Sequence, residues 1–230
     1  MEIWINPNLE SREFVKKWKS LDLLVSDLDK AVTGNQALLV ILRKLIRQPY
    51  QVFNPKIWDA TLTYIARGQS NAWKKFDGYF LNIKEKGKIK KKYTKEYAER
   101  KLYPGFKNFL SLLPNDTVEV FLTRNIDEVV CAYLKATGFD DALTENFDKE
   151  EGIKQLVEKY PGRKRMAMIG DSPEDEVVHN YFAWLLKKNK IEYYCTVNVG
   201  SINEKCDISL IKPNFNPLVE FIISNGYNIK

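Results

Sequence analysis

Three short apolar runs that each end in a polar residue constrain the fold of this chain more than any other feature. With the residue that ends each, they are LLVSD (23–27), VEVFLT (118–123) and RMAMIGD (165–171). Each run is too short for an ordinary helix, which predicts a strand. Helical segments separate the runs, and strands that alternate with helices predict a parallel sheet with helices on both faces.

The alternation continues to the end of the chain. We expect further strands at 192–200 and 206–211, and helices at 9–20, 106–113, 125–138, 149–162, 172–190 and 216–226. Gly138 and the Pro161–Gly162 pair are typical helix stops. The predicted fold class is therefore α/β, with a Rossmann-like parallel sheet at its centre.

A stretch of different character, residues 35–102, interrupts the pattern after the first strand. It contains no convincing strand, and its segments at 35–46, 55–67 and 71–83 have helical patterns. Most of its aromatic residues, Trp58 among the candidates, are expected to form the core of a helical block, and a few are expected to face the substrate. The sequence thus predicts an α/β core from residues 1–34 and 103–230, with an all-helical domain, 35–102, inserted in it.

Composition excludes several classes of protein. The 230 residues include three Cys without a CxxC pair and a single His, so a disulfide framework or a Cys/His zinc site is not expected. No apolar run reaches the length of a membrane span, and the first residues lack the apolar core of a signal peptide, so we expect a cytoplasmic protein. The net charge of +6 permits an anionic partner, although the Lys-rich run 84–95 is more simply a solvated surface.

The polar residues at the strand ends predict a site. Ligands of open parallel sheets bind beyond the carboxyl ends of the strands, so Asp27, Asp29, Thr123 and Asp171 are expected to converge. Converging carboxylates repel one another unless a cation neutralises them, and hard oxygen ligands suit Mg²⁺. A carboxylate can also act as a nucleophile toward phosphorus.

The order of these motifs resembles that of the haloacid dehalogenase-like superfamily of phosphohydrolases. The first motif of that family is an apolar strand followed by D-x-D, here LLVSDLD, and the second is a strand ending in Thr or Ser, here VEVFLT. The third is a Lys at the start of a helix, and the fourth is G-D-x-x-x-D after a strand, here GDSPED. The four motifs lie in the family's order within residues 21–175.

The resemblance implies a role for each acid. Asp27 would attack phosphorus and become an aspartyl-phosphate, while Asp29 would act as general acid and then general base. Mg²⁺ would be held by Asp27, the main-chain carbonyl of Asp29 and Asp171, with Asp175 assisting.

The third motif leaves two candidates, Lys149 and Lys154. Lys149 starts its helix and is therefore favoured. Contacts with the substrate phosphate are expected from Thr123, Arg124, Asn125 and Lys149.

The chain departs from the family at Lys30-Ala31, where the family often has Gly-Thr. The hydroxyl group of that Thr is missing, and a Lys stands beside the site. The departure affects fine geometry and rate rather than the class of reaction.

The helical domain occupies the place of the family's cap, and it resembles the cap of the phosphoserine phosphatase-like branch. The resemblance therefore implies a Mg²⁺-dependent phosphatase acting on a small phosphorylated metabolite. A phosphomutase, a nucleic-acid end phosphatase and a non-catalytic module that binds nucleic acid or protein remain as alternatives. The substrate and the oligomeric state are left open.

Overall fold

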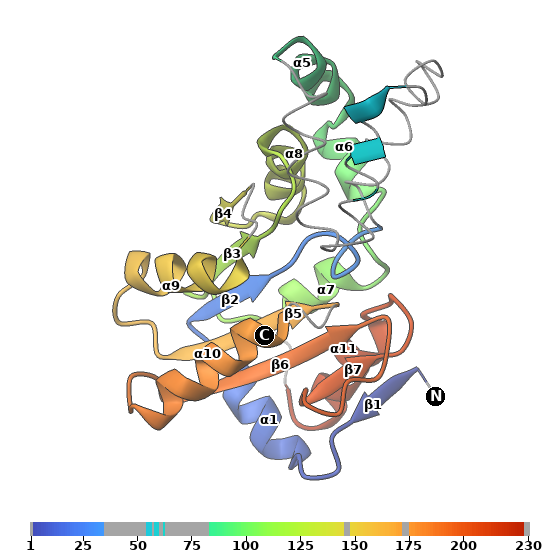
Figure 1. The fold of residues 1–230 in the computed structure, drawn as a ribbon. Coiled ribbons are helices and arrows are strands. Elements are labelled where there is room, and N and C mark those ends of the chain that lie inside the picture. Colours follow the sequence, from blue (N-terminus) through green and yellow to red (C-terminus); the bar gives the residue numbers. More distant parts are fainter. Residues whose placement is uncertain are drawn as a thin grey trace.

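The computed structural model of the protein describes residues 2–34, 54–56, 58–59, 62, 83–144, 148–171 and 175–227 (Figure 1). Within these residues, seven strands form one sheet in the order β1-β7-β6-β5-β2-β3-β4. The strands are β1 Ile3–Ile5, β2 Leu23–Ser26, β3 Val118–Leu122, β4 Asp141–Leu143, β5 Arg165–Gly170, β6 Tyr193–Val199 and β7 Ile208–Leu210. All neighbouring strands are parallel except β1, which pairs antiparallel with β7.

Helices cover both faces of this sheet, as the sequence predicts. Because successive strand residues point to opposite faces, Leu23 and Val25 of β2 belong to one buried cluster and Leu24 belongs to the other. The first cluster is completed by α9 (Lys149–Lys159) and α10 (Glu176–Lys187). Helices α1 (Ser11–Trp18), α7 (Phe106–Leu110), α8 (Asp127–Thr137) and α11 (Asn216–Ser224) complete the second.

The register of the three central strands brings their carboxyl ends into line. Ser26, the last residue of β2, lies opposite Phe121 of β3 and Ile169 of β5. The polar residue that follows each of these strands therefore lies within two residues of the level of Ser26. This alignment positions the candidate site.

Two strands were not predicted from the sequence. β1 and β4 have three residues each, which is too short for a two-residue periodicity to show. β1 also makes the sheet mixed rather than wholly parallel, because it adds an antiparallel edge next to β7.

Much of the predicted helical domain lies outside the described residues, including the segments 35–46 and 71–82. Its described end contains α5 (Ile83–Lys92) and α6 (Lys95–Glu99), which contact α8 of the core. Trp58 is 55% exposed, so it is not one of the aromatic residues that form a core. The domain boundaries at 34 and 103 stay predictions.

All three Cys are free thiols. In the part of the chain that is described, no helix is both long and apolar enough to cross a membrane.

Candidate active site

The site lies where β2, β3 and β5 end. Asp27 follows β2, Thr123 follows β3 and Asp171 follows β5. The ladder continues into these residues, because the Asp27 amide donates to the Ile169 carbonyl at 2.9 Å and the Thr123 amide donates to the Leu143 carbonyl at 3.0 Å. The convergence expected from the three apolar runs is thus present in the backbone.

Lys149 reaches into this convergence from the start of α9. The side chain of Asp148 caps the helix by accepting hydrogen bonds from the amides of Glu150 and Glu151, so Lys149 is the first helical residue. Its Nζ lies 3.1 Å from Oδ1 of Asp27 and 3.2 Å from Oδ1 of Asp175, and it donates to the Leu122 carbonyl at 2.8 Å. Lys149 is only 5% exposed, so its buried charge requires such partners, and two of them are acids of the site.

Lys154, the other candidate of the third motif, has a different environment. Its Nζ lies 2.6 Å from Oε1 of Glu150, one turn earlier on the same helix, and its side chain is exposed. The structure therefore brings Lys149, and not Lys154, to the acids.

Three carboxylates form a compact cluster beside Lys149. One oxygen from each of Asp27, Asp171 and Asp175 lies within 4.8 Å of the others. Asp175, which is 2% exposed, accepts a hydrogen bond from the Asp171 amide at 3.1 Å. Gly170 makes room for it, since a Cβ at this position would lie 2.6 Å from Oδ2 of Asp175.

The electrostatics of the cluster favour a bound cation. Burial, followed by the charges of Asp27 and Asp175, raises the pKa of Asp171 to about 7. Burial also raises the pKa of Asp27, and the Lys149 ammonium opposes that rise. Burial alone would lower the pKa of Lys149, but Asp175 and Asp27 outweigh it and raise that pKa. Carboxylate oxygens held together in this way are the donors that Mg²⁺ prefers, so the residues fit that ion.

Asp29 lies beside the cluster and is held by a different set of contacts. Nδ2 of Asn125 lies 3.2 Å from Oδ1 and 3.3 Å from Oδ2 of Asp29. Asn125 is 1% exposed, and its backbone N–H donates to Oγ1 of Thr123 at 3.2 Å. Its contact with the substrate phosphate stays a prediction, and the structure places its carboxamide against Asp29.

Arg124 is partly buried next to Thr123. Its charge opposes the rise in the pKa of Lys149. Its predicted contact with substrate stays a prediction.

The departure at Lys30-Ala31 has a visible consequence in the backbone. Lys30 has φ = 62°, in the left-handed region that favours Gly, and its amide donates to the Thr33 carbonyl at 2.7 Å. The Gly that the family often has at this position would adopt this turn without strain. Lys30 keeps the turn, and its charge lowers the pKa of Asp171 against the effect of burial.

Tyr103 is a residue near the site that sequence reasoning missed. Burial raises the pKa of its hydroxyl to about 12, with the charges of Asp171 and Asp29 adding to the effect. Its amide donates to the Val32 carbonyl at 2.9 Å, which ties it to the loop after Asp29. The only signal in the sequence is its place at the predicted boundary of the two domains.

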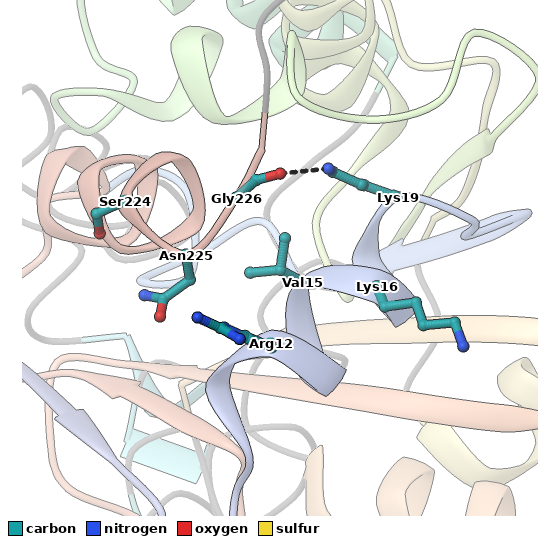
Figure 2. A pocket seen from close by; sticks show the side chains of 7 residues that line it. All are labelled: Arg12, Val15, Lys16, Lys19, Ser224, Asn225 and Gly226. Carbon is teal, nitrogen blue, oxygen red and sulfur yellow. Dashed lines mark hydrogen bonds between the residues drawn. The ribbon is translucent and has the colours of Figure 1, made fainter.

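A separate hollow of about 530 Å³ lies between α1 and the end of α11 (Figure 2). It is lined by Arg12, Val15, Lys16, Lys19, Ser224, Asn225 and Gly226, and Lys19 donates to the Gly226 carbonyl. Lys19 precedes the amino end of β2, whereas Asp27 follows its carboxyl end. The hollow is thus away from the acids and holds no carboxylate side chain among its lining residues.

Solved structures share this architecture. The chain is similar to a haloacid dehalogenase-like hydrolase from Burkholderia xenovorans, with 17% identity, a TM-score of 0.53, and coverage of 89% of this chain and 98% of the other. For a phosphoserine phosphatase in its apo form, the identity is 14%, the TM-score 0.57 and the coverage 87% and 98%. For the magnesium-bound hydrolase YfnB from Bacillus subtilis, the identity is 14% and the TM-score 0.52, with coverage of 89% of this chain and 100% of the other. No family model and no curated protein matches the sequence.

Proposed function

Because the chain has the haloacid dehalogenase-like fold, we propose that it is a Mg²⁺-dependent phosphatase that hydrolyses a small phosphorylated metabolite through an aspartyl-phosphate on Asp27. The observation that carries the proposal is the position of Lys149, with its Nζ 3.1 Å from the Asp27 carboxylate. A buried ammonium beside a strand-end carboxylate can offset the charge of a phosphoryl group that arrives there.

In the first step, a carboxylate oxygen of Asp27 attacks phosphorus. The bond from phosphorus to the leaving-group oxygen breaks, and Asp29 gives that oxygen its proton. Thr123 donates a hydrogen bond to the phosphoryl group, and Lys149 stabilises its charge.

The second step regenerates the enzyme. Asp29, now a carboxylate, takes a proton from a water molecule whose oxygen attacks phosphorus. The bond between phosphorus and Asp27 breaks, inorganic phosphate leaves, and Asp29 is protonated again. Correctly placed acid and base groups typically contribute ~10²–10⁴-fold in rate, so both steps depend on the orientation of Asp29.

Asp27, Asp171 and the main-chain carbonyl of Asp29 would hold Mg²⁺, with Asp175 supporting the metal site. The ion would supply positive charge to the nucleophile and to the phosphoryl oxygens. The support from this chain is the cluster of three carboxylates, two of which contact the Lys149 ammonium.

A screen of phosphate esters tests this proposal. The purified protein is given amino-acid phosphates, sugar phosphates, nucleotides and an end-phosphorylated oligonucleotide, and inorganic phosphate is measured with Mg²⁺ and with EDTA. We expect phosphate release from a small ester that requires Mg²⁺. Release from no ester would overturn the proposal, transfer between two positions of a sugar would indicate a phosphomutase, and a preference for the oligonucleotide would indicate a nucleic-acid end phosphatase.

A further inference from the structure

We infer that Asn125 is a positioning residue that holds the Asp29 carboxylate, and that it does not bind the substrate phosphate. The inference deepens the proposed phosphatase function and rests on it. It concerns how the general acid and base is kept in one orientation through two steps that need it in opposite protonation states.

The carboxamide of Asn125 can take only one orientation. Its Oδ1 accepts a hydrogen bond from the Ile126 amide at 3.0 Å. A backbone N–H can only donate, so the oxygen must face Ile126 and the NH₂ group must face Asp29. The orientation follows from the chemistry of the contacts.

The contact between Asn125 and Asp29 involves both oxygens of the carboxylate. Nδ2 of Asn125 lies 3.2 Å from one carboxylate oxygen of Asp29 and 3.3 Å from the other, so it donates to both. Asn125 is itself fixed by its backbone N–H, which donates to Oγ1 of Thr123. The position of Asp29 is thereby tied to the end of β3, where Thr123 lies.

Asn125 is also less accessible than Asp29. Asn125 is 1% exposed, whereas Asp29 is partly exposed. A side chain buried to this extent and already bonded to Ile126 and Asp29 is poorly placed to meet a phosphoryl group.

The test is a double-mutant cycle on a small alkyl phosphate, which needs a proton on its leaving group. We expect Asn125→Ala to lower kcat by about 10- to 100-fold, part of the general acid–base contribution, with KM changed less than twofold. In the Asp29→Ala background the same substitution is expected to have no further effect on the residual rate, because Asn125 acts through Asp29. Asn225→Ala, which also removes a carboxamide bonded to the backbone but lies beside the remote hollow, serves as control.

The outcomes separate the inference from the proposed function. A rise in KM with kcat retained would show that Asn125 binds substrate, and an equal loss in the Asp29→Ala background would show that it acts independently. Either result overturns the inference while leaving a phosphatase. A wild-type protein that hydrolyses no phosphate ester, or an Asp27→Asn variant as active as wild type, would overturn the proposed function and the inference with it.

Discussion

Nζ of Lys149 lies 3.1 Å from Oδ1 of Asp27, which joins the start of α9 to the end of β2. The side chain of Lys149 is almost fully buried, so solvent screens this ion pair less than it screens one on the surface. The same ammonium contacts Asp175, so a single cation holds two acids of the cluster in place.

Lys149 and Lys154 are expected to differ sharply when each is replaced by Met. Lys149→Met removes the ammonium that faces the acids, so turnover should fall by about 100-fold or more. Lys154→Met loses only an exposed ion pair with Glu150, so both turnover and stability should stay near wild type. Steady-state rates with saturating Mg²⁺ measure the difference, and equal mild losses from both variants would show that neither Lys has the third-motif role.

Gly170 is expected to control the position of Asp175. Because a Cβ at Gly170 would lie 2.6 Å from Oδ2 of Asp175, Gly170→Ala should displace that carboxylate and weaken binding of Mg²⁺. Gly87→Ala is the matched control, since its Cβ would meet nothing within 4 Å. Calorimetric titration with Mg²⁺ checks the prediction, and an unchanged affinity in Gly170→Ala would remove Asp175 from the metal site.

Glu119 should make the protein less stable as the pH rises. Burial, with a smaller contribution from the charge of Asp140, raises the pKa of Glu119 from 4.5 to about 7 in the folded protein. The folded state then holds a proton that the unfolded state releases, so this stabilising contribution is present below about pH 4.5 and is lost as the pH rises to 7.

Glu119→Gln isolates this contribution, because every other titrating group is shared with wild type. The free energy of unfolding in urea, measured for both proteins between pH 4.5 and pH 8, gives the comparison. We expect the wild type to lose stability relative to Glu119→Gln across this range, and a constant difference would contradict the assignment.

The sequence predicts the parts of the site that depend on the ends of elements. Asp27, Thr123 and Asp171 each follow an apolar run, and parallel strands bring their carboxyl ends to one edge. Lys149 could be favoured over Lys154 because it starts its helix, and the structure places it against Asp27. The fold class was predicted for the same reason, from the alternation of runs with helices.

The parts that escaped prediction depend on contacts between distant segments or on very short elements. The bond between Asn125 and Asp29 joins two loops, and nothing in the local sequence of either loop indicates it. Tyr103 approaches the acids only because the chain returns to the core beside Val32. β1 has three residues and gains its pairing from β7, which lies near the other end of the chain.

Replacement of the proposed nucleophile tests the central claim most directly. The measurement is the Mg²⁺-dependent release of inorganic phosphate by wild type, Asp27→Asn and Asp116→Asn, an exposed acid near the amino end of β3 that serves as control. The account predicts that Asp27→Asn loses about 10³-fold or more in turnover while Asp116→Asn remains close to wild type. Turnover by Asp27→Asn within a few fold of wild type would contradict it.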